Sequence, residues 1–224
     1  KIDSVKIKWE GINPNIHISQ LKLSDKKNNI ILETPVTVFR IDLLESLFEM
    51  SVNVSEIIIN NTSIIVTRDN SKISIKNLSF MDEINKTNDI VIPKIILKNS
   101  TIKLSDKSIK NTINFKINTL IVSSFKDALT INTNFFHKSS SDPITFIYHA
   151  KKAEGNDISK AYISGNSVNL PYDLLPPSLK QIKSDRISFR IWMDLNNMKI
   201  EKLAGNIAAS QLDVTLPLMN LRVK

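Results

Sequence analysis

The sequence has no cysteine and only four glycines among its 224 residues. The absence of cysteine excludes a disulfide-linked scaffold, a thiolate metal site and catalysis by a thiol. With so few glycines, the chain has almost no place for the glycine-rich loops that bind phosphates. Aromatic residues make up 6% of the chain. No apolar run reaches about 18 residues, the length that a membrane-spanning helix needs.

The composition is that of a folded protein with a diffusely basic surface. Apolar residues make up 42% of the chain and charged residues 23%, and the net charge is +8 with a pI of about 9.5. Basic chains often bind nucleic acid, but the 35 Ile, 25 Lys and 24 Asn are residue types that A/T-rich codons raise together. Because the lysines are spread along the chain and not clustered, we predict no nucleic-acid partner.

Alternation of apolar and polar residues is the main local pattern. It is regular in residues 72–76, 113–118, 129–135 and 186–195. Alternation of this kind is typical of strands with one dry and one wet face, and isoleucine favours strands through its stiff χ1 angle. The spacing of turn-forming residues predicts about 14 to 17 strands.

Helical pattern is scarce. Residues 42–50 could form a short helix, with Asp42 as its cap and Glu45 in its first turn. Two other short segments, within 172–182 and 81–86, could form a turn or two of helix. We therefore predict an all-β fold with a few short helices.

The chain also contains an internal repeat. The sequence IIINNTSI at 57–64 resembles IILKNSTI at 95–102, at an offset of 38 residues. Each copy has an asparagine pair or an Asn-Ser pair between two apolar stretches, which predicts a strand, an asparagine-centred turn and a second strand. This interpretation makes the repeat a hairpin used twice.

Catalytic and metal-binding patterns are missing. His17, His137 and His149 are far apart and form neither an HxH nor an HExxH motif. The chain has no P-loop and no nucleophile elbow, and its acidic residues occur singly. We predict that the protein is not an enzyme and that it uses no metal and no cofactor.

The many one-sided strands need something to cover their apolar faces. Helices are too few, so two alternatives remain. The first is a closed β-sandwich, serving as a structural or interaction domain of a secreted or surface protein. The second is a sheet curled into a trough whose interior is covered by lipid, because branched aliphatic side chains suit acyl chains.

If the sheet is a trough, its lining consists of the apolar members of the regular strands. The lining residues predicted on this basis are Ile73, Ile75, Ile113, Phe115, Ile117, Leu129, Ile131, Phe135, Ile187, Phe189, Ile191 and Met193.

A family resemblance favours the trough. The N-terminal stretch has the spacing W-x-G-x-x-P at Trp9, Gly11 and Pro14, followed by alternating aliphatic residues. Together with 41–47 and with 57–69, which ends in an Arg-Asp step, it resembles the AsmA-like proteins of the YhdP branch. The stretch 192–217 is similar more loosely. Small polar residues stand where that family has glycine, at Asn60-Asn61 and at Asn70-Ser71, and such residues can adopt the same left-handed backbone.

The resemblance implies a fold, a location and an activity. The fold would be an elongated, curled antiparallel sheet forming an open hydrophobic groove, with 1–88 as a chorein-like N-terminal unit and 89–224 as its continuation. The activity would be phospholipid transfer between the bacterial inner and outer membranes, with acyl chains as the bound partner. The protein would lie in the periplasm, anchored to the inner membrane by a helix before Lys1, with an open edge strand around 212–223.

Overall fold

The computed structural model describes residues 1–24, 30–69, 72–76, 93–106, 111–125, 128–137, 142–153, 156–169, 182–183, 186–196, 199–209 and 213–214. These residues form one helix, α1 (Leu43–Phe48), and fifteen strands: β1 (Ser4–Glu10), β2 (Asn13–Ser24), β3 (Ile30–Ile41), β4 (Val54–Asn60), β5 (Ser63–Asp69), β6 (Lys72–Lys76), β7 (Lys94–Asp106), β8 (Asn111–Phe125), β9 (Ala128–His137), β10 (Ile144–Ala153), β11 (Asn156–Val168), β12 (Ile182–Lys183), β13 (Ile187–Asn196), β14 (Lys199–Ala209) and β15 (Asp213–Val214).

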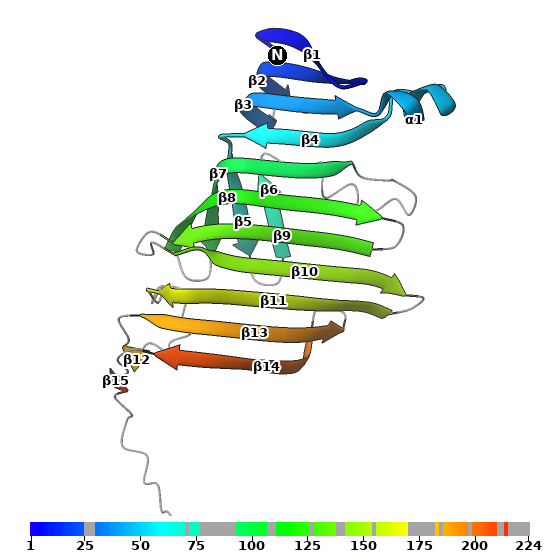
Figure 1. Ribbon diagram of the computed structural model, residues 1–224. Helices are drawn as coiled ribbons and strands as arrows, with labels where there is room; N and C mark the ends of the chain where they lie inside the picture. Colours follow the sequence, from blue (N-terminus) through cyan, green and yellow to red (C-terminus); the bar gives the residue numbers. More distant parts are fainter. Residues whose placement is uncertain are drawn as a thin grey trace, which may run out of the picture.

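Thirteen of the strands form one sheet in the order β1-β2-β3-β4-β7-β8-β9-β10-β11-β13-β14, with β5 beside β7 and β6 beside β5. Within the described ranges, β1 and β14 have no second neighbour, so the sheet is curled but open (Figure 1). This confirms the predicted elongated all-β fold. The two-stranded pairing of β12 with β15 is the only other sheet in the described part of the chain, so these strands do not form a sandwich of two comparable sheets.

The sheet departs from the prediction in the direction of two strands. Neighbouring strands are antiparallel except that β4 and β5 both run parallel to β7. Within the described residues, the edge strand at the C-terminal end of the sheet is β14. Of the expected edge strand around 212–223, the structure describes only β15, which is paired with β12, and the rest lies outside the described residues. The helical segments expected within 172–182 and 81–86 lie outside the described residues.

Helix α1 confirms the prediction for 42–50. Asp42 adopts an extended N-cap conformation, and its Oδ1 accepts a hydrogen bond from the backbone N–H of Glu45 at 3.0 Å. This bond satisfies one of the N–H groups that a helix leaves free at its start.

Alternation along each strand separates the sheet into two faces. We call one of them the apolar face, since it carries a buried cluster of Leu21, Ile59, Ile64, Ile95, Leu97 and Val122. The opposite, polar face carries most of the charged side chains and a smaller cluster of Val38, Ile58 and Ile96. Paired residues in a ladder point to the same side, so the register extends both faces from β1 to β14.

Left-handed residues interrupt the alternation at four places. Gln20, Asn99 and Ser167 lie within β2, β7 and β11 and have φ angles of 53°, 48° and 53°, and Asn61, between β4 and β5, has a φ angle of 55°. Each lets the next apolar residue stay on the same face, as Leu97 and Ile102 do on either side of Asn99. The interpretation of Asn61 and Asn99 as hairpin turns was wrong, and Asn99 lies inside the single strand β7. In the described ladders, β4 and β5 do not pair with each other but follow one another along β7, because a single left-handed residue bends a strand without reversing it.

Candidate functional site

The middle of the apolar face is dry. Ile59, Leu97 and Ile117 are almost completely inaccessible to solvent, and burial of such a side chain stabilises the fold by about 2 kcal/mol. Two polar residues among them satisfy their hydroxyls locally. Ser100 Oγ donates to the carbonyl of Lys98 at 2.9 Å, and Thr62 Oγ1 donates to the carbonyl of Glu33 at 2.9 Å. Thr37 and Thr133 also lie on this side of the sheet, and their buried hydroxyls have no hydrogen-bond partner among the described residues. The face is therefore mainly, though not entirely, hydrocarbon.

The register places ten of the twelve predicted lining residues on the apolar face. Three of them are in β8 and three in β9, where Leu129 and Ile131 pack against the central cluster and Phe115 meets Phe135 edge to face at 5.3 Å. The four in β13 follow from the ladders across β9, β10 and β11: Ile187, Phe189, Ile191 and Met193. The other two lie in β6, where the register pairs Ile75 with Val66 and Ile73 with Arg68.

Alternate residues of β10 also lie on this face, although none of them was among the predicted lining residues. Ile144 and Tyr148 pair with the lining residues Phe135 and Ile131 of β9, and Phe146 lies between them on the same face, opposite Thr133. Beside them in β11, Gly165 makes room for an aromatic ring, since a Cβ atom there would stand 2.9 Å from Cε1 of Phe189. The alternation in 144–148 was the sequence signal that could have identified them.

The apolar face does not stop at the core. In β1, more than half of the surface of Val5, Ile7 and Trp9 is exposed, and the register continues from them into the central cluster. At the other end, the same holds for three residues of β14: Ile200, Leu203 and Ile207. The face is thus one apolar strip across the whole sheet, buried in the middle and exposed at both end strands. Neither end strand contributed a residue to the predicted lining.

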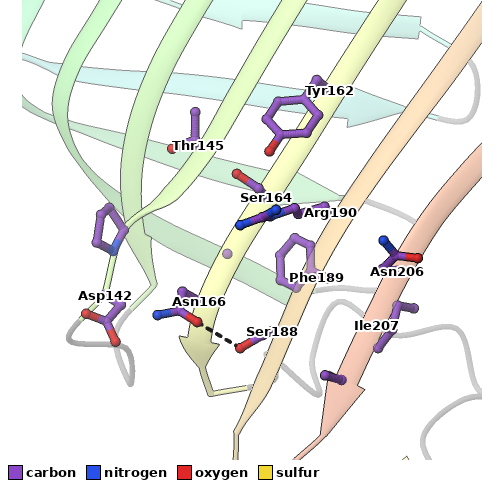
Figure 2. Close-up of a pocket in the computed structure, with 13 residues that line it drawn as sticks. Asp142, Thr145, Tyr162, Ser164, Asn166, Ser188, Phe189, Arg190, Asn206 and Ile207 are labelled. Carbon is purple, nitrogen blue, oxygen red and sulfur yellow. Dashed lines mark hydrogen bonds between the residues drawn. The ribbon is translucent and has the colours of Figure 1, made fainter.

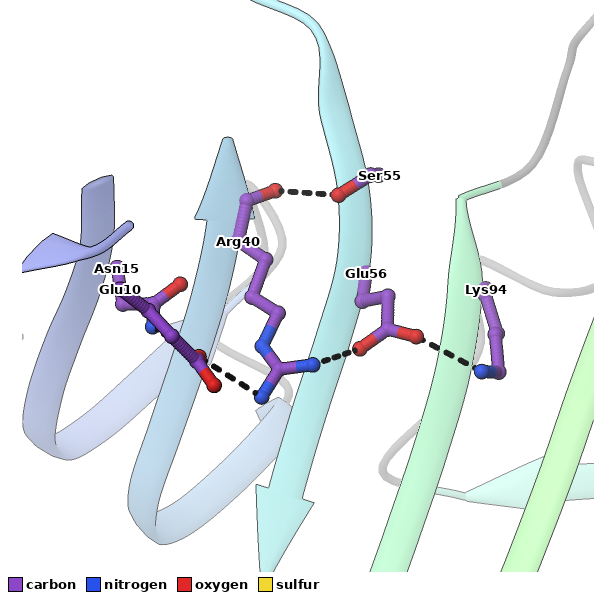
Figure 3. Close-up of polar contacts among 6 residues, drawn as sticks. All are labelled: Glu10, Asn15, Arg40, Ser55, Glu56 and Lys94. Atoms are coloured by element: carbon purple, nitrogen blue, oxygen red, sulfur yellow. Dashed lines mark hydrogen bonds and ion pairs between the residues drawn. The ribbon is translucent and has the colours of Figure 1, made fainter. Parts of the chain in front are cut away.

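The polar face carries an ion-pair ladder across the first strands of the sheet. Arg40 lies between two carboxylates, with Nη1 at 2.8 Å from Glu56 Oε2 and Nη2 at 3.1 Å from Glu10 Oε2 (Figure 3). Lys94 Nζ lies 2.7 Å from Glu56 Oε1. The hydrogen bond from Lys94 lowers the pKa of Glu56 below its ordinary value of 4.5 against the effect of partial burial, and the charges of Lys94 and Arg40 lower it further. This ladder links β1, β3, β4 and β7 and has the character of a structural brace.

A depression of about 550 Å³ is lined by residues of β10, β11, β13 and β14, among them Phe189 and Ile207 of the apolar face. Figure 2 shows Tyr162, Ser164 and Arg190 along it. Its serine at position 188 donates to Asn166 Oδ1 at 3.0 Å and accepts from the N–H of Ser167 at 3.0 Å. An amide cannot take a proton from a hydroxyl, so this arrangement is not that of an activated nucleophile.

Among the residues that the structure describes, no three His, Cys, Asp or Glu side chains gather as a metal site. In the same part of the chain, no helix is long and apolar enough to cross a membrane.

Comparison with known proteins agrees with this geometry. The family model described as YhdP protein matches residues 1–224, which is the whole sequence. No curated protein matches the chain.

Proposed function

Because the chain belongs to the YhdP family of AsmA-like proteins, whose role is related to lipid transport, we propose that it transfers phospholipids between the bacterial inner and outer membranes along its apolar face. The acyl chains lie on the hydrocarbon surface of that face. The headgroups remain in water along the open side of the sheet.

The observation that supports this proposal is the continuity of the apolar strip. A protein that only needs a core buries its apolar residues and ends the sheet with polar edge strands. Here the strip reaches both end strands with its large side chains exposed, as at Trp9 and Leu203. A surface that is apolar from end to end on an open sheet suits a ligand that moves along it, and acyl chains need no hydrogen bonds on the way.

The lining residues have different roles along the path. The side chains that close the dry middle, such as Ile113 and Ile117, form its base. The half-buried ones on β9 and β13, such as Ile131, Ile191 and Met193, offer the surface on which acyl chains lie. No reacting group is needed, and we propose no enzymatic step.

The proposal includes a location. The chain lies in the periplasm as the membrane-proximal start of the path, held at the inner membrane by an anchor. It consists of an N-terminal unit, 1–88, and a continuation, 89–224. The boundary between them falls outside the described residues, and the pairing of β4 with β7 joins the two units in one sheet.

Photo-crosslinking on the two faces of β13 tests the proposal. Benzoylphenylalanine replaces Phe189 on the apolar face, and a matched variant carries it in place of Trp192, an aromatic residue of the polar face on the same strand. We expect phospholipid adducts at position 189 and few or none at position 192 when the protein is expressed in a bacterial envelope. Equal labelling at both positions, or none at either, would contradict transfer along the apolar face.

A further inference from the structure

Helix α1 carries its apolar stripe on the outside. Leu44, Leu47 and Phe48 follow the i, i+3, i+4 spacing of one helical face. In a globular protein, such a face packs against the core. Here no residue of α1 is buried, and Leu47 and Phe48 are 67% and 87% exposed.

The polar side of the same helix is turned inward and fixes this orientation. Ser46 Oγ donates to the carbonyl of Asp42 and accepts from the N–H of Asn53 at 2.9 Å. The N–H of Asp42 donates to the carbonyl of Asn53 at 3.0 Å, and the N–H of Ser51 donates to the carbonyl of Ser46 at 3.1 Å. The connection between β3 and β4 is therefore closed by hydrogen bonds that leave its apolar side chains in solvent.

The apolar surface continues beyond the helix. Met50 is 95% exposed and Val52 more than half exposed. The neighbouring turn between β1 and β2 adds Ile12 and Trp9, since the N–H of Leu43 donates to Asn13 Oδ1 at 3.2 Å. We call this set the α1 tip: Trp9, Ile12, Leu44, Leu47, Phe48, Met50 and Val52. Figure 1 shows α1 standing out beyond the ends of the neighbouring strands.

We propose that the α1 tip inserts into the surface of a lipid bilayer, where the lipid path along the apolar face begins. This inference rests on the proposed function. Trp9 belongs both to the tip and to the apolar strip of β1, so the tip is continuous with the surface that carries lipid. A projecting tip can enter the headgroup region where a flat sheet cannot, and Trp, Phe, Leu and Met side chains favour that region.

The charge of the tip indicates how it binds. Residues 42–53 include Asp42, Glu45 and Glu49 but neither lysine nor arginine. Trp9 is flanked in the sequence by one lysine, Lys8, and one glutamate, Glu10. Attraction to anionic headgroups therefore contributes little at this point, and the binding energy comes mainly from burial of apolar area. We expect the tip to bind zwitterionic bilayers and to do so with little dependence on salt.

Tryptophan fluorescence tests the insertion. The chain has two tryptophans, so Trp192→Phe leaves Trp9 as the reporter in the tip. With phosphatidylcholine vesicles that carry brominated acyl chains, we expect quenching of Trp9 and co-sedimentation of the protein. In the same background, Leu47→Ser with Phe48→Ser should weaken vesicle binding by about tenfold or more.

The matched control is Phe125→Ser with Ile158→Ser, two exposed apolar residues that the register places on the polar face, outside the apolar strip. This control should bind vesicles like its parent. Both pairs are exposed, so both variants should keep the parent's circular dichroism. Absence of vesicle binding by the parent, as expected if the tip binds another protein, would overturn the inference. So would an equal loss in the two variants.

The inference and the proposed function fail separately. Native mass spectrometry after loading from detergent micelles reports acyl-chain occupancy of the apolar face without any vesicle. Occupancy that persists in the Leu47→Ser, Phe48→Ser variant, together with its loss of vesicle binding, would support the tip as the docking point. If acyl chains occupy the apolar face but the Leu47→Ser, Phe48→Ser variant binds vesicles as well as its parent, the inference about the α1 tip would be overturned and the proposed function would stand.

Discussion

Asn61, between β4 and β5, and Asn99, within β7, occupy equivalent positions beside each other, both with left-handed backbone, and the N–H of Asn61 donates to the carbonyl of Lys98 at 3.0 Å. The same offset continues on both sides, as in the bond from the N–H of Thr62 to Ser100 Oγ, 38 residues apart. The sequence repeat is thus the register of the parallel ladder that β4 and β5 form with β7.

The first prediction concerns these two bends. A left-handed conformation costs a residue with a Cβ roughly 1–2 kcal/mol, which asparagine partly offsets and glycine avoids. We expect Asn61→Ala and Asn99→Ala each to lower the free energy of unfolding by about 1 kcal/mol, and Asn61→Gly to leave it nearly unchanged. Urea unfolding measures the difference. Asn132→Ala, at an exposed position of the regular strand β9, should leave the free energy of unfolding unchanged. If it lowered that free energy as much as Asn61→Ala does, the left-handed backbone would not be the cause.

The second prediction separates the two faces by charge. Ile191 is half-buried on the apolar face, opposite Ile163 and Gly205. An arginine there can extend its charge to water along the open side, so we expect Ile191→Arg to cost about 1–3 kcal/mol and to remain folded. Lipid occupancy, measured by native mass spectrometry, should fall severalfold.

Asn206→Arg is the control for this charge, since residue 206 is exposed on the polar face of the adjoining strand. This variant should remain folded and should keep the lipid occupancy of the natural protein. A closed core would instead unfold with Ile191→Arg, and a folded variant with full lipid occupancy would show that the acyl chains lie elsewhere.

Much of this architecture follows from local sequence. Alternation at 113–118, 129–135 and 186–195 gave the strands and the face of each lining residue, because side chains in a strand alternate strictly. The helix at 42–50 followed from its cap. These features depend on neighbours in sequence, so one chain suffices to predict them.

Other features depend on distant contacts. The Asn61 and Asn99 motifs read equally well as hairpins or as bends, and only pairing with β7 decides between them. The stripe of Leu44, Leu47 and Phe48 predicts an amphipathic helix but not whether its apolar side faces the protein. Its outward direction is set by hydrogen bonds between Ser46 and residues at the two ends of the connection. Exposure of β1 and β14 likewise depends on their place at the ends of the sheet.

The third prediction concerns pH. The pKa of Glu56 is lower in the folded protein than its ordinary value of 4.5, so its ion pairs stabilise the fold fully above that pH and are lost as the pH falls through the folded pKa. Glu56→Gln should cost about 1–2 kcal/mol at pH 7, because Arg40 and Lys94 lose their shared negative charge and one of the two acceptor oxygens is replaced by a donor group. The difference from the natural protein should shrink as urea unfolding is repeated towards pH 3.

Glu33→Gln is the control for Glu56. Its pair with Lys22 is longer, at 3.6 Å, and both side chains are well exposed. An exposed pair of this kind contributes less than about 1 kcal/mol. If the difference in free energy of unfolding between Glu56→Gln and the natural protein grew as the pH fell, the ionised form of Glu56 would not be what stabilises the fold.

The fourth prediction concerns the end strand β14. Gly205 lies opposite Ile191, and a Cβ atom at position 205 would stand 2.5 Å from the carbonyl oxygen of Arg190 and 3.1 Å from Cα of Ile191. These are backbone atoms, so Gly205→Ala must move β14 away from β13. Because β14 is exposed throughout and has one neighbour in the described sheet, we expect local opening of this strand and not global unfolding. Backbone hydrogen exchange should therefore rise by about tenfold or more in β13 and β14, with little change in β7 and β8.

The neighbouring Ala204→Ser, at an exposed position, should leave exchange unchanged. If Gly205→Ala instead destabilised all strands equally, β14 would be an integral part of the core and not an end to which the sheet can add further strands.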